Sequence, residues 1–217
     1  MTFHVGLDLG QSADYTALAV VQDVKEMNGA TTPGKPERRL HLRHLERYPL
    51  RTPYPEIAEK VAALMRDPHL SPEVFDAASL RRARKHPRLA VDATGVGRAV
   101  TDLLRSKGLR FTSVTITGGD KANRPAGGYS WRVPKRDLVA ALEVPFHAGT
   151  LKVAEGLELW PTLKGELLRF RRKINLATAH DSYEHWRESD HDDLVLATAL
   201  ACWDMTRPGN RAMRLIR

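Results

Sequence analysis

Apolar segments with the spacing of β-strands are spread over the first three quarters of the chain. The main candidates are residues 3–9, 16–24, 38–48, 89–92 and 111–117, and residues 150–154 form a shorter one. In 38–48 leucines alternate with basic side chains, as expected for a half-exposed strand. The pattern therefore predicts three strands in direct succession and two further main strands later in the chain.

Segments with helical spacing fill the intervals between and after these strands. A helix is expected from Pro55 to Met65, and Pro68 ends it. The other expected helices cover about residues 98–108, 134–146, 157–173 and 190–205. Two intervals rich in Gly and Pro, residues 25–37 and 118–132, are predicted to be loops.

The order of these elements predicts an α/β protein. Three hairpin-connected strands followed by strand, helix and strand is the layout of the RNase H-like fold, whose first and fourth strands are adjacent and parallel at the sheet centre. We therefore expect a central mixed five-stranded sheet, with three antiparallel strands and then two parallel ones, flanked by helices. A length of 217 residues suits one such domain, which we place at residues 1–206, with residues 207–217 as a basic C-terminal tail.

Carboxylates occur at the ends of the elements that this fold brings together. Asp8 and Asp92 each close an apolar run that breaks into Gly and small polar residues, and Asp190, Asp192 and Asp193 open the last helix. Parallel neighbouring strands lie ~4.8 Å apart, which places Asp8 and Asp92 within reach of one shared ion. Hard cations such as Mg²⁺ or Mn²⁺ prefer carboxylate oxygens, and two of them about 4 Å apart hydrolyse phosphodiesters.

Small residues indicate how the last helix reaches these acids. Period-2 alternation puts Gly6 on the face of Asp8 and Ala90 on the face of Asp92, so the sheet beneath the acids is nearly bare of side chains. On the last helix, Asp193, Ala197 and Ala201 fall at i, i+4 and i+8. We expect this stripe to pack over Gly6 and Ala90 and to bring Asp193 to the other two acids, with Asp192 rotated toward one flank.

A purely structural interpretation exists for each acid taken alone. Asp8 and Asp92 are also ordinary turn residues, and Asp190, Asp192 and Asp193 are the acids that cap a helix N-terminus and match its dipole. Their joint placement, at three element ends in the expected order, favours a metal site over this interpretation.

The charge balance indicates a polyanionic partner. Lys and Arg number 34 against 26 Asp and Glu, which gives a formal charge of +8 and a pI near 9.8. A merely basic protein with no such partner has the same composition. The candidate phosphate contacts are the run 81–88, the run 169–173 with Arg171 and Arg172, the pair Lys135 and Arg136, and the pair Lys121 and Arg124 in the Gly-rich loop. Tyr129 and Trp131 are candidates for stacking on a base, although Trp131 equally suits the core.

Cysteine usage and hydropathy exclude several other classes. The single cysteine, Cys202, lies in an apolar run and is expected to be a small buried hydrophobe, so neither a disulfide scaffold nor a thiolate metal site is expected. No stretch reaches the about 18 consecutive apolar residues of a membrane helix. We expect no membrane partner and a cytoplasmic protein.

Four segments resemble the nuclease domain of phage large terminase subunits, and the likeness extends over nearly the whole chain. Residues 6–21 resemble the family's first strand and hairpin, 91–108 its second acidic motif with the following helix, 133–142 its lysine-containing helix start, and 191–201 its last acidic helix. The resemblance implies a two-metal endonuclease that cleaves duplex DNA with little sequence specificity, in the cytoplasm of a bacterial host. It implies that Asp8, Asp92 and Asp193 hold two Mg²⁺ or Mn²⁺ ions, that Asp190 or Asp192 adjusts the second ion, and that His191 is a proton-transfer residue beside them or a surface residue.

The sequence departs from that family in lacking the motif of an ATPase motor. Full terminases carry an ATPase before the nuclease, and the phosphate-binding loop G-x-x-x-x-G-K-[ST] does not occur in this sequence. We therefore expect a nuclease module, a fragment or a stand-alone relative, and any motor, small terminase or portal protein to be a separate partner.

Three other functions fit parts of the pattern. A RuvC-like Holliday-junction resolvase shares the fold and the acids, with Asp190 and Asp193 at i, i+3. An actin-like ATPase or sugar-kinase lobe would use the turns after Asp8 and Asp92 for phosphate, although this chain is too short for two lobes. A catalytically silent DNA-binding module has the same basic surface.

Overall fold

The computed structural model describes residues 1–10, 14–26, 37–76, 81–119, 121–125, 129–176 and 192–207. The strands are β1 (Thr2–Asp8), β2 (Ala17–Glu26), β3 (Glu37–Arg47), β4 (Glu73–Asp76), β5 (Arg81–Arg84), β6 (Arg88–Asp92), β7 (Phe111–Thr117), β8 (Ser130–Pro134) and β9 (Leu151–Val153). The helices are α1 (Tyr54–Arg66), α2 (Gly97–Ser106), α3 (Lys135–His147), α4 (Trp160–Leu176) and α5 (Asp193–Thr206), with a short 3-10 turn at Pro68–Leu70. No described helix is long and apolar enough to cross a membrane.

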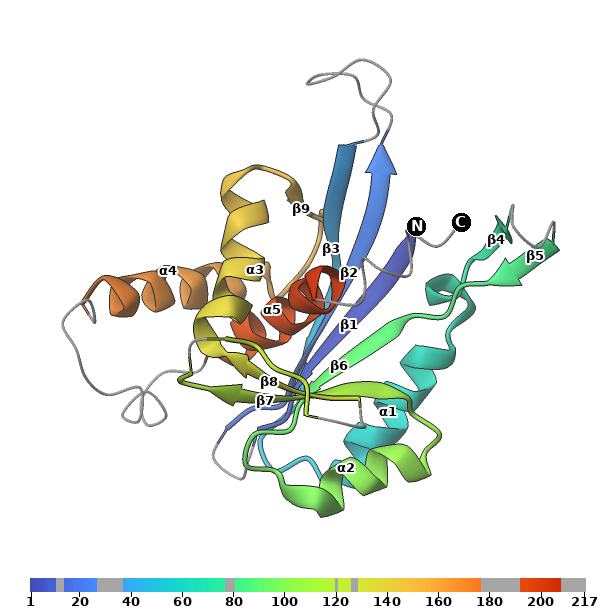
Figure 1. Cartoon of the computed structure of the whole chain (residues 1–217), viewed down its shortest axis with the longest axis horizontal. Helices are drawn as coiled ribbons and strands as arrows, with labels where there is room; N and C mark the ends of the chain where they lie inside the picture. Colours follow the sequence, from blue (N-terminus) through green and yellow to red (C-terminus); the bar gives the residue numbers. More distant parts are fainter. Residues whose placement is uncertain are drawn as a thin grey trace.

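Seven strands form the main sheet in the order β8-β7-β6-β1-β2-β3-β9 (Figure 1). β1, β2 and β3 pair antiparallel, whereas β6 pairs parallel with both β1 and β7. The predicted mixed sheet of an RNase H-like fold is therefore confirmed in its five central strands. Two parallel edge strands extend it, since β9 joins β3 and β8 joins β7.

The edge strand β8 was missed by the sequence prediction, which assigned residues 118–132 to a loop. Trp131 and Val133 are buried and alternate with exposed Ser130 and Arg132, which is a strand pattern. Glycines before this segment and Pro134 after it obscured the pattern. The segment before β8 also contributes a bridge between Asn123 and Arg132.

A second difference is the small hairpin of β4 and β5, which lies outside the main sheet. The sequence prediction treated residues 81–88 only as a basic run. The run forms β5 and the start of β6, and the hairpin extends from the body of the molecule near the amino end of β6 (Figure 1).

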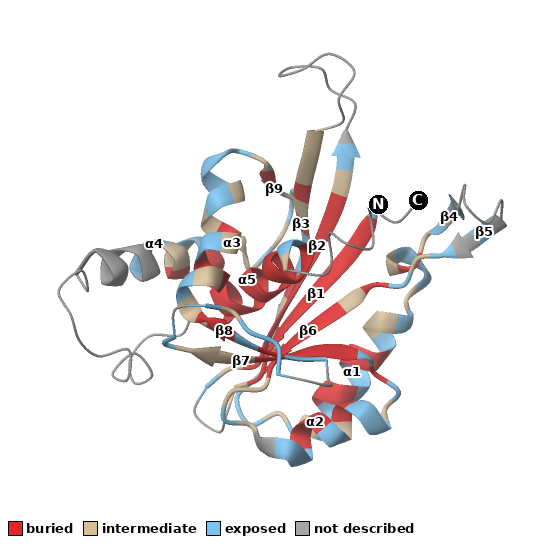
Figure 2. Cartoon of the chain, in the orientation of Figure 1, coloured by how far each residue is buried: buried red, intermediate tan, exposed pale blue. Residues whose placement is uncertain are grey.

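Helices cover both faces of the sheet, and each face has its own core. α1 and α2 pack on one face against alternate residues of β1, namely Phe3, Val5 and Leu7. α3, α4 and α5 lie on the other face, where α5 crosses the sheet centre (Figures 1 and 2). The alternation of β1 therefore turns His4, Gly6 and Asp8 toward the face that α5 covers. Cys202 is fully buried on α5, as predicted, and burial raises the pKa of its thiol to about 12.

The close approach of α5 to the sheet depends on Gly6. A methyl group built on Gly6 would lie 1.9 Å from the backbone oxygen of Ala197 and 2.8 Å from the backbone nitrogen of Ala201. Gly6 pairs directly with Ala90 across the parallel strands, and Ala90 is buried in the same cluster as Ala197 and Ala201. The predicted packing of the small-residue stripe over Gly6 and Ala90 is confirmed.

The far end of α5 is fixed by a buried group of charges. Asp204 accepts a hydrogen bond from Arg207 Nε at 2.7 Å, lies 2.9 Å from His4 Nδ1 and forms an ion pair with Arg88 at 3.0 Å. Eleven residue steps along the helix lead from Asp193 to Asp204 and span ~16 Å, while four steps along the strand lead from His4 to Asp8 and span ~13 Å. Anchoring Asp204 on His4 therefore places Asp193 close to Asp8.

Gly6→Ala should destabilise the protein strongly. The methyl group would collide with helix backbone, which cannot rotate away as a side chain can, so we expect a loss above the ~1–3 kcal/mol of ordinary overpacking. The measurement is the free energy of unfolding in urea. Gly118→Ala is the matched control, because a methyl group there has no neighbour within 4 Å. Equal stability of the two variants would show that α5 does not rest on Gly6.

Candidate active site

Asp8 and Asp92 end the two parallel strands at the sheet centre. β1 and β6 pair in register as far as Leu7 and Val91, so the next residues of both strands are the two aspartates. Asp8 is 8% exposed and Asp92 is 7% exposed. Asp92 Oδ1 also accepts a hydrogen bond of 2.8 Å from the backbone N–H of Thr94, which holds the turn after the strand. The structure therefore brings these two predicted acids side by side.

Two further acids come from the start of α5. Asp193 is the first helical residue and is 4% exposed. Asp192 is the residue before the helix, with φ −119° and ψ 18°, and its side chain makes no capping hydrogen bond. The helix was expected to begin at about Asp190 and begins at Asp193, so the argument from helical rotation does not apply to Asp192.

The pKa of Asp8 reflects the charges of the other three acids. It is raised well above its usual value, first by burial and then by the negative charges of Asp92, Asp192 and Asp193, while Lys135 lowers it. A set of carboxylates that oppose one another's ionisation in this way is an electrostatic environment that favours a bound cation. Asp190 and His191 were also predicted to contribute, and they lie outside the described residues.

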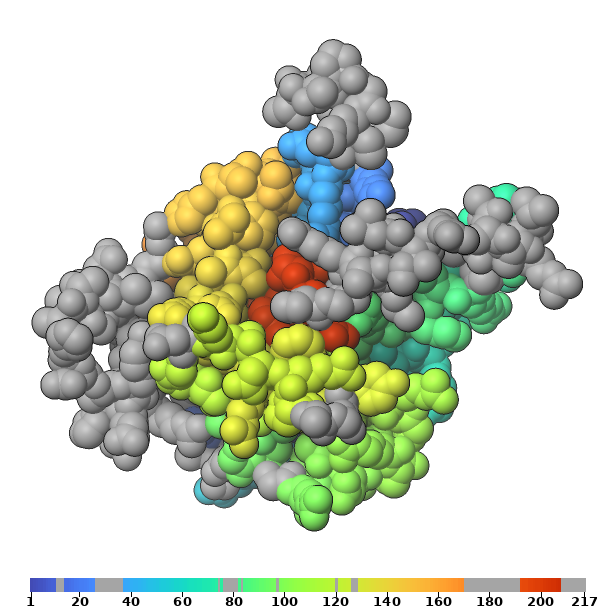
Figure 3. Space-filling model, in the orientation of Figure 1, coloured from blue at the N-terminus to red at the C-terminus, as the bar shows by residue number. Residues whose placement is uncertain are grey.

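Lys135 occupies a specific position beside these acids. It is the first residue of α3, after Pro134, and its Nζ lies 3.1 Å from Asp192 Oδ2. In the space-filling view α3 lies beside α5, which accounts for this contact (Figure 3). Lys135 was predicted as a phosphate contact, and the structure places it among the acids.

Two site residues were not identified from the sequence, namely Arg47 and Glu166. Arg47 ends β3 and donates from Nε to Asp193 Oδ2 at 2.7 Å, and its Nη2 donates to Glu166 on α4. Glu166 is 2% exposed and accepts a second hydrogen bond, of 3.2 Å, from the backbone N–H of Val195. The available sequence signal was a glutamate on the apolar side of a helix, three residues after the buried Leu163.

The pKa of Glu166 provides a pH-dependent prediction. It is raised to about 7, mainly by burial and by the charge of Asp193, although Arg47 opposes both. A carboxyl whose folded pKa lies above its unfolded value of about 4.5 contributes stability that is complete below pH ~4.5 and is lost as pH rises through ~7. The shift corresponds to a loss on the order of 2–3 kcal/mol for the metal-free protein.

The check is the difference between two pH profiles of unfolding free energy, one for the metal-free wild type and one for Glu166→Gln. The amide does not titrate, so the wild type should lose stability relative to the variant between about pH 4.5 and 7. The difference cancels the contributions of Asp8 and His4, which are common to both proteins. Parallel profiles would show that Glu166 keeps an ordinary pKa.

The donor set suits a hard divalent cation by its chemistry, because it consists of carboxylates from separate elements. Among the described residues, however, no three carboxylate, histidine or cysteine side chains converge closely enough to hold a metal ion as they stand. Lys135 holds Asp192 and Arg47 holds Asp193 in this arrangement. Side-chain rotation at one of these two acids would be needed for a three-carboxylate site.

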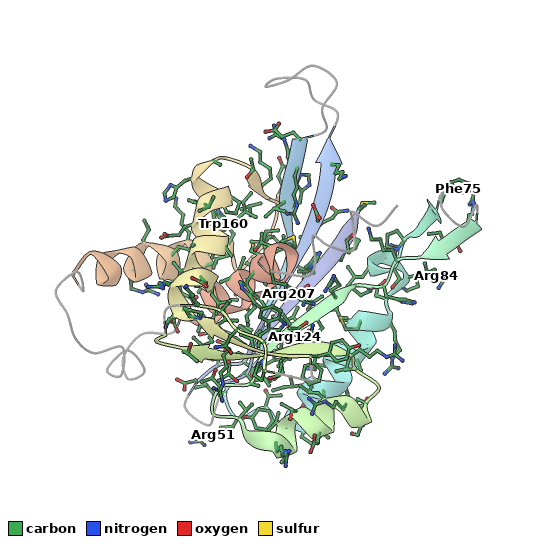
Figure 4. The ribbon with its side chains drawn as sticks, in the orientation of Figure 1. Arg51, Phe75, Arg84, Arg124, Trp160 and Arg207 are labelled. Atoms are coloured by element: carbon green, nitrogen blue, oxygen red, sulfur yellow. The ribbon has the colours of Figure 1, made fainter. Side chains whose placement is uncertain are left out.

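The other predicted DNA contacts are only partly placed. Lys121 and Arg124 are exposed in the segment before β8, where Figure 4 labels Arg124, and Arg136 is exposed on α3. Arg171 and Arg172 belong to α4, but their side chains lie outside the described part. Trp131 is 5% exposed and packs edge-to-face on Trp203 with ring centroids 5.7 Å apart, so it is a core residue and is not available to stack on a base. Tyr129 is 78% exposed.

Two solved structures share the architecture over most of their length. The large terminase nuclease from thermophilic phage G20c superposes with a TM-score of 0.50 and 17% identity, over 92% of this chain and 80% of that chain. The human cytomegalovirus terminase nuclease domain, in a Mn-soaked and inhibitor-bound structure, gives a TM-score of 0.52 and 16% identity, over 97% and 85%. No family sequence model and no curated protein matches the chain. The chain therefore has the RNase H-like fold of terminase nuclease domains.

Proposed function

We propose that this chain is a metal-dependent endonuclease that cleaves duplex DNA with little sequence specificity. The observation that carries the proposal is the cluster of Asp8, Asp92, Asp192 and Asp193, whose negative charges raise the pKa of Asp8. A fold likeness alone does not establish an activity. Neighbouring carboxylates that oppose one another's ionisation cost free energy in the metal-free protein, and a bound cation would relieve that repulsion.

In this proposal Asp8, Asp92 and Asp193 hold two Mg²⁺ or Mn²⁺ ions, with Asp192 or Asp190 assisting at the second ion. When bound, such ions supply a water of lowered pKa and stabilise the departing oxygen of the phosphodiester. Manganese is supported by the Mn-soaked cytomegalovirus domain of the same fold. Lys135 lowers the pKa of Asp8 and so partly offsets the burial and the neighbouring negative charges that raise it.

Duplex DNA is the substrate that the charge supports, since a net charge of +8 favours binding to phosphates without reading sequence. Lys121, Arg124 and Arg136 are the exposed residues proposed to contact it, together with Arg171 and Arg172. We place the nuclease domain at residues 1–206 and a basic tail at 207–217, most of which lies outside the described residues. An ATPase motor, a small terminase subunit or a portal protein in a bacterial cytoplasm would be a separate partner.

The test is incubation of supercoiled plasmid with the protein and Mg²⁺, Mn²⁺ or EDTA. Nicked and linear products should form with either ion and should be absent in EDTA. A parallel reaction uses a four-way DNA junction, and a third monitors ATP turnover. Symmetric cutting confined to the junction would favour a resolvase, ATP turnover would favour the kinase-like alternative, and binding without cutting would favour a silent DNA-binding module.

A further inference from the structure

Arg47 connects four separate parts of the molecule. It lies at the end of β3, where it pairs with Ala17 of β2. Its Nε donates to Asp193 on α5, its Nη2 donates to Glu166 on α4, and its guanidinium carbon lies 4.8 Å from the ring centroid of Tyr15 in the segment between β1 and β2. The side chain is only 17% exposed. A long cationic side chain held from three sides has little freedom to adopt another position.

Glu166 completes a closed set of contacts around the start of α5. One of its oxygens accepts from Arg47, and the other accepts from the backbone N–H of Val195, in the first turn of the helix. The same pair of side chains therefore fixes both the Asp193 carboxylate and the backbone two residues later. Only arginine suits the position of Arg47, because its planar fork directs separate N–H groups at two carboxylates.

We infer that Arg47 and Glu166 are positioning residues that fix the orientation of Asp193 and thereby set the metal affinity of the site. The inference rests on the proposed function. In the alternative role, the guanidinium of Arg47 occupies the position of a metal ion, and a binding metal must displace it. Two observations favour positioning. Arg47 Nε bonds Asp193 at Oδ2 while its Nη2 bonds Glu166, so the guanidinium is shared between two carboxylates and is not dedicated to neutralising Asp193. The second observation is that Glu166 also bonds the backbone N–H of Val195, which a cation that merely replaced a metal would not require.

The two roles predict opposite effects on metal binding. Loss of a positioning partner of a metal ligand typically lowers metal affinity by about 10–100-fold. Loss of a competing cation raises affinity instead, because the site becomes more negative. Arg47→Gln changes both position and charge. At about pH 8, above the pKa of Glu166, the double variant Arg47→Gln/Glu166→Gln removes one positive and one negative charge and leaves the net charge unchanged. The double variant therefore isolates positioning.

The experiment is titration of Mn²⁺ into metal-free protein without DNA, by calorimetry. Arg47→Gln and the double variant should each bind Mn²⁺ about 10–100-fold more weakly than the wild type. Arg47→Lys should be weakened less, and it replaces Arg47→Gln if that variant does not fold. Arg43→Gln is the control, since Arg43 is exposed on the same strand and bonds Gln22, and it should bind as the wild type does. Mn²⁺ affinity that is unchanged or tighter in the Arg47 variants would overturn the inference.

A metal-independent measurement separates this inference from the proposed function. Amide hydrogen exchange at Val195 in the metal-free protein should accelerate at least tenfold in Arg47→Gln, because Glu166 loses the partner that fixes it. A wild type that binds no Mn²⁺ would refute the proposed function, while faster exchange would still support the positioning of the first turn of α5. Normal Mn²⁺ binding by the wild type with unchanged exchange and affinity in the Arg47 variants would refute the inference alone.

Discussion

Asp8→Asn should lower metal-dependent DNA cleavage on the order of a thousandfold, because an amide supplies no charge to hold a divalent cation. Asp8 is central to the site, since its pKa responds to Asp92, Asp192, Asp193 and Lys135 together. DNA affinity should change little, because it depends on basic residues elsewhere on the surface. The measurements are the rate of plasmid nicking at saturating Mn²⁺ and the affinity for a short duplex in EDTA.

The same variant should be more stable than the wild type when no metal is present. A buried carboxylate with a raised pKa costs free energy when it ionises at neutral pH, and asparagine removes that cost. Stability that rises while activity falls would exclude misfolding as the cause of the loss. Asp102→Asn is the control, because Asp102 is 65% exposed on α2, and it should retain both properties. Cleavage by Asp8→Asn at near wild-type rate would refute the assignment of the active site.

The part of this site that could be predicted from the sequence is the part encoded by local pattern. Strand ends mark Asp8 and Asp92, and Gly6 with Ala90 indicates where a helix can approach closely. The parallel pairing of β1 and β6 then follows from element order alone. These features can be predicted because each depends on a few neighbouring residues and on a topology with few alternatives.

Features that depend on contacts between distant elements could not be obtained in this way. Arg47 and Glu166 lie 119 positions apart in the chain, and no local pattern pairs them. The orientation of Asp192 depended on the residue at which α5 begins, and helix boundaries are the least certain feature of a sequence prediction. The strand β8 was missed because glycines precede it and Pro134 ends it. The contact of Trp131 with Trp203, which places this strand against the core, is visible only in the fold.

Asp193→Asn should impair cleavage far more than Asp192→Asn. A metal ligand needs neighbouring residues that fix its side-chain orientation. Asp193 is 4% exposed and bonds Arg47, which in turn bonds Glu166. Asp192 is 28% exposed in its side chain, precedes the helix and bonds Lys135. We expect losses of about a hundredfold or more for Asp193→Asn and about tenfold for Asp192→Asn.

One feature favours Asp192 as the third metal ligand in place of Asp193, and the comparison of the two variants decides between them. Asp192 raises the pKa of Asp8 more than Asp193 does, which indicates that its charge acts more strongly on Asp8 in the metal-free protein. Rotation of Asp192 away from Lys135 would then make it the third ligand. Nicking rates at matched Mn²⁺ distinguish the two assignments, with Mn²⁺ affinity measured in parallel. An inactive Asp192→Asn beside a nearly normal Asp193→Asn would show that the residue preceding α5, and not its first residue, completes the metal site.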